Sequence, residues 1–431
     1  MESIAIIGTG IAGMGCGHFL HQEAEVDLYE QNDYIGGHTN TAYVKEDGKT
    51  ISVDTGFIVF NYHTYPNLVK LFDQLKVEIT PTNMSFGVQH IPSGLVFGSK
   101  KMFAQKLNFF KPSFWKLLFQ IQRFYNEAEE VLEDDRYASY SLEDFIAERK
   151  YNQDFVHQYI VPMSSALWST PVNTTLKYPV RVLINFFKNH GLLGISTQFQ
   201  WYTVKNGSWQ YRDKLIAPFK NKIQVNKKVS RVTRENNKAV LYFKNGEFKV
   251  YDKVIIATHA DQALALLGDP TSLEKQLLAP FEYQKNIAKL HTDEAVMPKI
   301  RSTWSAWNYR VQDIDGVLRA TTIYDMNILQ NVSQKKNYFV SINDPNLIDE
   351  SKVIRSIQYD HPIFTPATAA AQEKLYQLNE NGVSYFCGSY FRFGFHEDAF
   401  TSAVNVCNRI LNRDVWSKAV PIKKPEEKLV S

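Results

Sequence analysis

The amino-acid sequence predicts an α/β fold that opens with a nucleotide-binding strand, turn and helix, and two observations carry this prediction. The apolar run 3–7 leads straight into a glycine-rich turn, and a stretch of small residues with helical character follows it. A second strand then ends at Glu30, about 20 residues beyond the turn. A strand, a tight turn and a helix followed by another strand begin a parallel sheet with helices on its faces.

The turn has the spacing Gly8-x-Gly10-x-x-Gly13. In a unit of this kind, the backbone N–H groups at the start of the helix can bind the pyrophosphate of a dinucleotide. Glu30 can accept hydrogen bonds from the adenosine ribose hydroxyls, and its negative charge would repel a 2′-phosphate. We therefore expect FAD or NAD, and not NADP.

The doublet Gly36-Gly37 favours FAD over NAD. It comes just after the second strand, where a backbone without side chains can pass close to the flavin end of an extended cofactor. A nicotinamide enzyme has no obvious need for this feature.

Length and composition set the class of protein. A chain of 431 residues suits two closely packed domains. The net charge of +3 is too small to indicate binding to nucleic acid.

The cysteines and the apolar runs indicate the compartment. Cys16, Cys387 and Cys407 are odd in number and have no metal-like spacing, so we expect neither a disulfide framework nor a metal site, and a reducing compartment. No run reaches the roughly 18 apolar residues of a spanning helix, and we expect a cytoplasmic protein that is free or bound to the cytoplasmic face of a membrane.

The rest of the chain alternates between helical and strand patterns. A long helix is predicted over 112–133, with Pro112 in its first turn. Strands are predicted over 50–57, 224–229, 239–243, 248–251, 253–258 and 382–389. A helix through Val404 should follow the last strand, and the polar residues 414–431 should form a loose tail.

Five further segments resemble the flavin-containing amine oxidoreductase superfamily. They are 166–171 (ALWSTP), 185–191 (NFFKNHG), 290–294 (LHTDE), 305–309 (SAWNY) and 394–398 (GFHED). The resemblance covers nearly the whole chain and is strongest to a bacterial subgroup of predicted NAD/FAD-binding proteins often encoded near cyclopropane-fatty-acyl-phospholipid synthases. It implies a discontinuous Rossmann-like FAD-binding domain built from 1–85, 205–285 and 375–413. An amine-oxidase-like α+β substrate domain would comprise 86–204 and 286–374.

The resemblance also implies which residues bind FAD. The glycine turn would hold the pyrophosphate, Glu30 the adenosine ribose, and the backbone of Val229 the adenine edge. The start of the last helix would approach the ribityl chain and the flavin, where its positive end stabilises negative charge. The implied set is Gly8, Gly10, Ile11, Ala12, Gly13, Glu30, Gln31, Gly36, Gly37, His38, Thr39, Thr55, Gly56, Val229, Gly388, Ser389, His396, Glu397, Asp398 and Ala399.

The sequence departs from the superfamily pattern at three places. Ser389 stands where an acid is frequent, so one ribityl or phosphate contact changes. The segment 359–366 holds no cysteine for covalent attachment, so we expect non-covalent FAD, with a histidyl link at His361 as the alternative. The superfamily lysine near flavin N5 has no clean counterpart: Lys285 and Lys289 lie in the right segment, and Asn286 fits about as well.

Candidate catalytic residues are His291, Asp293, Phe395 and Lys289. An imidazole and an acid two residues apart lie on one face of a strand and could relay a proton. The alternative is a structural hydrogen-bonded pair at a domain junction. Phe395 matches the position of an aromatic wall over the flavin.

The segment 99–123 is basic and aromatic. It contains six cations and no acid, and they alternate with aromatic and aliphatic residues. Such a segment could lie on an anionic bilayer and admit an acyl chain to the site, or it could be the solvated basic face of a packed helix. The cations are Lys100, Lys101, Lys106, Lys111, Lys116 and Arg123.

The predicted function is an FAD-dependent oxidoreductase of the dehydrogenase, desaturase or isomerase type. It would act on a fatty acyl group or related lipid by hydride transfer to flavin N5, a substrate class suggested by the subgroup and by the segment 99–123. One alternative is an oxidase of small amines. The other is a non-catalytic flavoprotein partner of a lipid methyltransferase.

Overall fold

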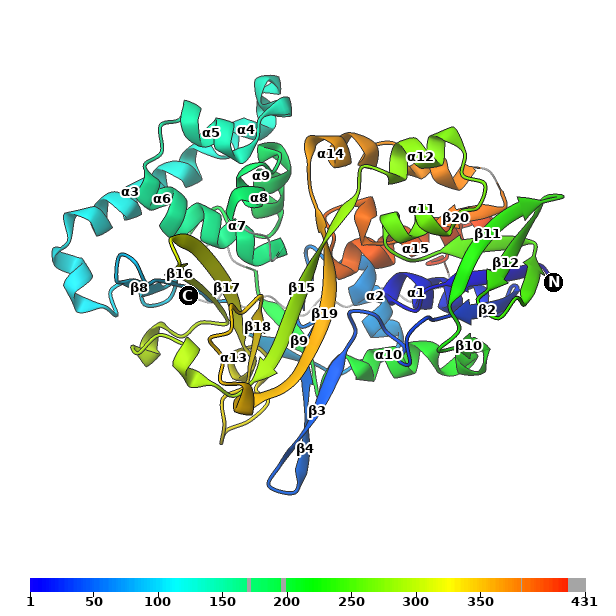
Figure 1. Cartoon of the computed structure of the whole chain (residues 1–431), viewed down its shortest axis with the longest axis horizontal. Coiled ribbons are helices and arrows are strands. Elements are labelled where there is room, and N and C mark those ends of the chain that lie inside the picture. Colours follow the sequence, from blue (N-terminus) through cyan, green and yellow to red (C-terminus); the bar gives the residue numbers. More distant parts are fainter. Residues whose placement is uncertain (169–171, 195–198, 381, 418–431) are drawn as a thin grey trace.

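The computed structural model describes residues 1–168, 172–194, 199–380 and 382–417, and they form two halves joined by long strands (Figure 1). The half at the right of Figure 1 is built on a five-stranded parallel sheet with the order β10-β2-β1-β14-β20. These strands are β1 Ser3–Ile7, β2 Glu25–Tyr29, β10 Ile223–Gln224, β14 Lys253–Ile256 and β20 Ser384–Phe386.

Side chains alternate across this sheet and so fill two separate cores. Ile4 and Ile6 of β1 pack with α1 (Ile11–Leu20) and α15 (His396–Leu411) on one face. Ala5 and Ile7 pack on the other face with the antiparallel sheet β11 (Val229–Glu235), β12 (Lys238–Phe243) and β13 (Phe248–Tyr251). A parallel sheet covered on both faces needs such continuously apolar strands.

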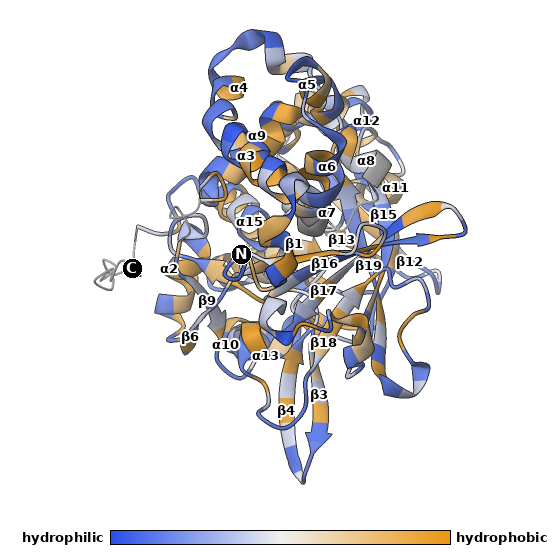
Figure 2. Cartoon of the chain, turned by 90° about the vertical axis from the view of Figure 1, so that its left-hand side faces the viewer, coloured by the Kyte–Doolittle hydropathy of each residue, from blue (hydrophilic) through white to orange (hydrophobic). Residues whose placement is uncertain are grey.

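The other half combines a mixed seven-stranded sheet with a group of helices. The sheet has the order β19-β15-β18-β17-β16-β7-β8, and the helices α3 to α9 gather beside it (Figures 1 and 2). The strands are β7 Phe86–His90, β8 Leu95–Gly98, β15 Glu282–His291, β16 Trp307–Ile314, β17 Val317–Asp325, β18 Phe339–Ile342 and β19 Val353–Ile363. The helices are α3 Pro112–Glu127, α4 Glu130–Glu133, α5 Leu142–Glu148, α6 Gln153–Phe155, α7 Val161–Trp168, α8 Val172–Leu176 and α9 Val180–Asn189.

Smaller elements complete the structure. The hairpin of β3 (Thr41–Glu46) and β4 (Lys49–Asp54) projects from the lower edge in Figure 1. A second small sheet joins β5 (Phe60–Asn61), β9 (Trp201–Val204) and β6 (Ile79–Thr82). The remaining α-helices are α2 Pro66–Gln74, α10 Trp209–Ile216, α11 Ala260–Leu266, α12 Ser272–Leu278, α13 Met326–Gln330 and α14 Pro366–Gln372, and the short helical turns include η1 Lys106–Phe110, η2 Asp135–Ser139, η5 Glu294–Val296 and η9 Ser389–Phe391.

The antiparallel pair β15 and β19 spans the junction between the halves. Its register runs from Glu282 opposite Ile363 to His291 opposite Val353. The expected domain boundary at 285/286 therefore falls inside β15, whose residues pair with the seven-stranded sheet on both sides of that point.

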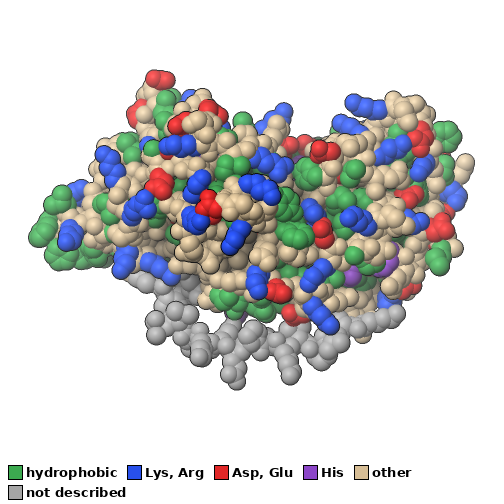
Figure 3. Space-filling view, turned by 90° about the horizontal axis from the view of Figure 1, so that it is seen from below, with side chains coloured by type: hydrophobic (Ala, Val, Ile, Leu, Met, Phe, Trp, Pro, Cys, Tyr) green, Lys and Arg blue, Asp and Glu red, His purple; other side chains and the backbone are tan. Residues whose placement is uncertain are grey.

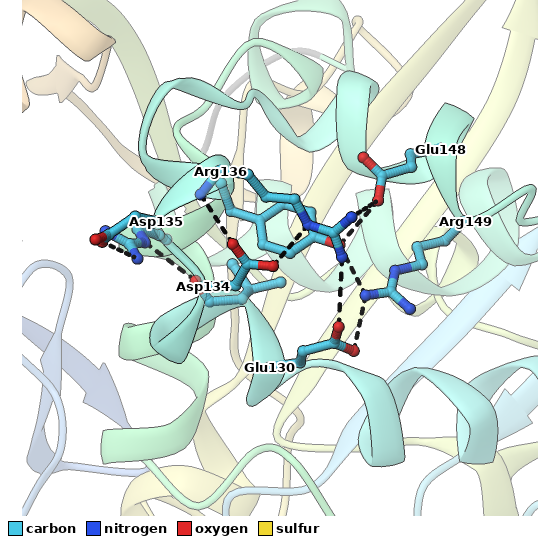
Figure 4. A network of polar contacts seen from close by, with 9 residues as sticks. Glu130, Asp134, Asp135, Arg136, Glu148 and Arg149 are labelled. Atoms are coloured by element: carbon cyan, nitrogen blue, oxygen red, sulfur yellow. Dashed lines mark hydrogen bonds and ion pairs between the residues drawn. The ribbon is translucent and has the colours of Figure 1, made fainter.

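An ion-pair network holds the outer helices together (Figure 4). Arg136 pairs with Asp134 at 2.7 Å, and Arg149 pairs with Glu130 at 2.8 Å. Arg149 also donates to the hydroxyl of Tyr137 at 2.7 Å. A single exposed ion pair contributes little to stability. These pairs form a connected network, which links α4, η2 and the end of α5.

Several predicted elements differ from those in the structure. The helix over 112–133 divides into α3 and α4. The strand over 224–229 is wrong: β10 ends at Gln224, Asn226 takes a left-handed turn (φ 54°), and β11 begins at Val229. The last helix extends past Val404 to Leu411 and ends at a left-handed Asn412.

The start of the predicted tail is packed. The indole N–H of Trp416 donates to Asn67 at 3.0 Å, and its ring meets Phe19 edge to face. Residues 418–431 lie outside the described part of the chain. In the described part, no helix combines the length and apolar character needed to cross a bilayer.

Candidate functional site

A cavity of about 1150 Å³ lies where the two halves meet. Its walls come from the β1–α1 turn, the end of β2, the segments around residues 38, 57 and 229, most of β19, and the start of α15. This volume exceeds the usual range of small-ligand pockets, roughly 300–1,000 Å³. A large cofactor and a substrate can therefore share it.

The three glycines of the turn have different roles. A Cβ at Gly13 would lie 1.9 Å from the carbonyl oxygen of Gly8, so Gly13 permits close contact between helix and strand. Gly8 has a left-handed φ of 100°. A Cβ at Gly10, by contrast, would meet no protein atom within 4 Å. Gly10 is the N-cap of α1 and lines the cavity, so the open space beside it is available to a ligand.

Glu30 is buried at the end of β2, and four protein donors hold its carboxylate. One oxygen accepts from the N–H (3.0 Å) and the hydroxyl (2.7 Å) of Thr9. The other accepts from the N–H and the side-chain amide of Asn32, both at 2.9 Å. The two side-chain donors can turn away, so ribose hydroxyls can replace them without moving the carboxylate.

The loop 36–38 lies against the start of α1. A Cβ at Gly37 would come within 3.2 Å of the Cα of Gly10, and a Cβ at Gly56 would lie 2.2 Å from the carbonyl oxygen of His38. Close backbone contact thus explains these glycines. Cavity-lining members of the predicted set are Gly8, Gly10, Ile11, Ala12, Glu30, Gln31, Gly37, His38, Gly56, Val229, Gly388, Ser389, His396 and Ala399.

The other predicted cofactor residues do not line the cavity. Gly13, Gly36, Thr39 and Thr55 lie behind its wall. Thr55 supports that wall, because its hydroxyl bonds to the carbonyl of Asn40 at 2.9 Å and to the Tyr359 hydroxyl at 3.0 Å.

Glu397 and Asp398 are buried capping residues and not cavity-lining groups. Glu397 accepts from the N–H groups of Asn67 and Leu68 at 2.9 Å each and so caps α2. Asp398 accepts from the N–H of Phe395 at 2.9 Å and caps α15 itself. Burial raises the pKa of both acids, that of Asp398 to about 7. The motif therefore positions the start of α15, whose His396 and Ala399 do line the cavity.

Besides His190, four histidines line the cavity: His38, His259, His361 and His396. The ring of His38 stacks on Tyr359 (4.7 Å) and on His361 (5.7 Å). Burial lowers the pKa of His38, His259 and His396, to about 3 for His396, and neighbouring imidazoles lower that of His38 further. These three rings are therefore neutral at physiological pH.

The hydrogen bonds around His361 define its tautomer. The Asn286 oxygen accepts from Gln284 (2.8 Å) and from Asn343 (2.7 Å), so its amide nitrogen faces His361 Nδ1 at 2.9 Å. Because Nδ1 accepts this bond, the neutral ring carries its proton on Nε2. Asn286 thus orients a cavity histidine and does not itself line the cavity.

Aromatic and aliphatic side chains form another part of the cavity wall, and most of them belong to the half with the seven-stranded sheet. Phe395 stacks on Phe186 at 4.9 Å, and Phe186 stacks on His190 at 3.8 Å. Burial lowers the pKa of His190 to about 4. We call this group the apolar wall, and it consists of Met84, Phe86, Met163, Phe186, His190, Leu192, Trp201, Trp307, Tyr324 and Phe395.

The predicted relay of His291 and Asp293 is corrected by the structure, because neither residue lines the cavity. His291 is fully buried at the end of β15, where its Nε2 bonds to Ser341 at 2.8 Å and its Nδ1 accepts from the N–H of Asp293 at 3.1 Å. Asp293 caps η5 and pairs with Lys352 at 2.9 Å. Lys289 pairs with Glu350 at 2.6 Å. The structural alternative accounts for this group.

Sequence comparison agrees with this site. Residues 11–296, which are 286 of the 431 residues, match the family described as flavin containing amine oxidoreductase. A shorter stretch of 76 residues is 36% identical to 15-cis-phytoene desaturase of Synechococcus elongatus. That stretch covers 17% of this chain and 15% of the desaturase, so the shared part is a small fraction of either protein.

Solved structures share the fold over almost the whole chain. Cyclohexylamine oxidase from Brevibacterium oxydans superposes with a TM-score of 0.67 at 16% identity and covers 96% of this chain and 100% of its own. The CLA-producing fatty acid isomerase from P. acnes gives 0.66 at 13% identity, with 95% and 98% covered. A putrescine oxidase variant gives 0.67 at 12%, with 96% and 99% covered. The match over most of the chain shows that this protein belongs to the flavin containing amine oxidoreductase family and is an FAD-dependent oxidoreductase.

Proposed function

We propose that this FAD-dependent oxidoreductase acts on an apolar substrate whose reacting part is uncharged, of which a fatty acyl group or related lipid is the best match. The observation that carries the proposal is the apolar wall, whose side chains are aromatic or aliphatic apart from one histidine with a lowered pKa. Such a surface binds hydrocarbon by excluding water from it.

Charge distinguishes this substrate class from small amines. An ammonium group enters a buried site at a high cost in free energy unless a carboxylate or comparable acceptor pairs with it. Among the described residues that line the cavity, the acids are Glu30 and Asp360. Glu30 is bonded to Thr9 and Asn32, and Asp360 is a partly exposed residue of β19 that accepts from Gln358 at 3.3 Å. Neither belongs to the apolar wall.

The cavity-lining residues of the nucleotide-binding half fit FAD. The open space at Gly10 and the fixed carboxylate of Glu30 suit a pyrophosphate and an adenosine ribose. The 16-residue helix α15 directs its positive end at the cavity from His396. With no cysteine in 359–366, we propose that the cofactor is held non-covalently. When bound, FAD supplies the acceptor for a hydride.

The protein side chains then have supporting tasks. The stacked rings of Phe395 and Phe186 exclude water from the reacting part of the substrate. His361 presents a neutral ring with its proton on Nε2, held by Asn286. Because burial lowers the pKa of His38, His259 and His396, these imidazoles add no charge to the cavity.

Ligand binding to the FAD-loaded protein tests the proposal. We expect oleate below its micellar concentration to perturb or bleach the flavin absorption under anaerobic conditions, and cyclohexylamine and putrescine to leave it unchanged. Leu192→Asp, which places a charge in the apolar wall, should abolish the response to oleate. Leu347→Asp, at a position 40% exposed elsewhere in the chain, is the matched control. Bleaching by an amine with release of hydrogen peroxide would replace the proposal with amine oxidation. No response to any ligand would favour the non-catalytic alternative.

A further inference from the structure

Six large apolar side chains are exposed together at the end of the molecule that carries η1 and the start of α3. They are six of the 18 exposed large hydrophobic residues of the described chain, and they fall within residues 103–119. Phe110 is 79% exposed, Phe119 69% and Leu107 68%. Figure 3 shows hydrophobic side chains gathered at this end, at the left of the view, with Lys and Arg side chains around them. We call this surface the aromatic patch, and it consists of Phe103, Leu107, Phe109, Phe110, Trp115 and Phe119.

The aromatic patch is ordered by contacts among its own rings. Trp115 meets Phe103 at 5.4 Å and Phe109 at 5.7 Å, and Phe109 meets Phe110 at 5.5 Å. The indole N–H of Trp115 donates to the carbonyl of Phe109 at 2.8 Å. Phe119 follows Trp115 by one helical turn and so shares its face of α3. Because these contacts already restrict the rings, docking would cost little further side-chain entropy.

The surroundings of the aromatic patch are positively charged. Residues 79–126 contain no Asp or Glu. Within the described chain, the five lysines at 100, 101, 106, 111 and 116 form no ion pairs, and all but the half-buried Lys111 are exposed. Arg123, counted with them in the sequence prediction, is excluded, because it pairs with Glu127 at 2.7 Å and donates to the carbonyl of Arg149 at 2.9 Å.

We propose that the aromatic patch docks the protein onto an anionic lipid bilayer. Phenylalanine and tryptophan side chains insert at the boundary between headgroups and acyl chains, and lysines beside them attract anionic headgroups. A second copy of the chain fits less well, because a symmetric contact through this patch would bring the two sets of lysines together.

Hydrogen bonds connect the start of this basic segment to the apolar wall. The N–H of Ser99 donates to the carbonyl of Phe86 at 2.7 Å, and the N–H of Phe86 donates to the Ser99 hydroxyl at 3.1 Å. Phe86 belongs to the apolar wall, and the segment with the lysines starts immediately after Ser99. Docking would therefore place on the membrane the half of the protein that carries most of the apolar wall. The docking proposal does not depend on the substrate proposed above, and vesicle binding is measured without turnover.

Sedimentation with vesicles tests the proposal on the full-length, FAD-loaded protein. We expect binding to vesicles of equimolar phosphatidylglycerol and phosphatidylcholine at low salt, and little binding to phosphatidylcholine alone. Raising the salt to about 0.5 M should weaken binding, because the charges are then screened. Lys111→Gln with Lys116→Gln should weaken it about 25-fold, at roughly fivefold per cation. Lys220→Gln with Lys222→Gln, which changes the charge equally at exposed positions of another surface, should leave it unchanged.

A second pair of variants tests insertion of the aromatic rings. Phe110→Ser with Phe119→Ser should reduce vesicle binding at least tenfold, whereas Phe248→Ser with Val250→Ser, at exposed positions on β13, should not. Equal flavin content and melting temperature exclude misfolding as the cause. The proposal is overturned if the protein does not pellet with anionic vesicles, if neutral vesicles bind it equally, or if binding survives loss of both rings. Self-association that the ring variants abolish, without vesicle binding, would assign the patch to a second copy instead.

Discussion

Replacing Gly10 with valine should remove FAD and leave the fold intact. Gly10 has φ −63° and ψ 176°, which an L-residue adopts without strain, and its Cβ would meet no protein atom within 4 Å. The side chain would instead occupy the space assigned to the pyrophosphate. Losing two hydrogen bonds to a charged phosphate, at about 1.5–3 kcal/mol each, amounts to about 3–6 kcal/mol of binding free energy.

Flavin content after gel filtration and the unfolding temperature of the flavin-free protein measure the two parts of this prediction. Gly10→Val should retain less than about one hundredth of the wild-type FAD affinity, at 1.4 kcal/mol for each factor of ten, and should unfold near the temperature of the wild-type apoprotein. Gly13→Ala is the contrasting variant, because its Cβ would lie 1.9 Å from the Gly8 carbonyl oxygen, so it should destabilise the apoprotein. Full FAD occupancy in Gly10→Val would refute the assignment of the turn to the pyrophosphate.

Acid precipitation should release all the FAD into the supernatant, and yellow colour retained in the pellet would show a covalent link. Glu30→Ala should weaken FAD binding by about 1.5–3 kcal/mol in a fluorescence titration, and unchanged affinity would mean that another group binds the ribose. His291→Ala should keep its FAD but lower the unfolding free energy by about 1–3 kcal/mol, since the bonds to Ser341 and Asp293 are lost; a flavin-loaded variant of normal stability that has lost turnover would restore the relay. Burial lowers the pKa of His396 to about 3 in the folded protein, so between pH 6.5 and 3 the unfolded chain binds one proton more and the unfolding free energy falls as the pH falls. In denaturant titrations, His396→Gln should remove about 1.4 kcal/mol per pH unit of this dependence. Parallel pH profiles of the variant and the wild type would contradict this prediction.

The nucleotide-binding half could be predicted from the sequence because its signals are local. The glycine spacing, the apolar strands and the acid after β2 all act within the first 30 residues, and the structure places each of them as expected. The strands predicted over 239–243 and 248–251 are similarly local, and they form the antiparallel pair β12 and β13.

The features that the sequence could not predict depend on the direction in which side chains point and on contacts between distant segments. Glu397 and His396 are neighbours in one motif, yet successive residues of a helix point about 100° apart, so one caps α2 and the other lines the cavity. His38, His259, His361 and His396 come from segments up to 358 residues apart, and no spacing rule connects them. His291 and Asp293 looked like a relay because the strand was expected to continue, whereas β15 ends at His291.

The central claim, that FAD bound in this cavity acts on an apolar lipid substrate, is tested most directly by comparing the lipids of cells with and without the gene. Mass spectrometry should show a class of acyl lipid whose hydrogen content or double-bond position differs between the two. The wild-type gene should reverse the difference, and the FAD-free Gly10→Val variant should not. Identical lipids in both cells, together with a small amine that accumulates only when the gene is absent, would contradict the claim.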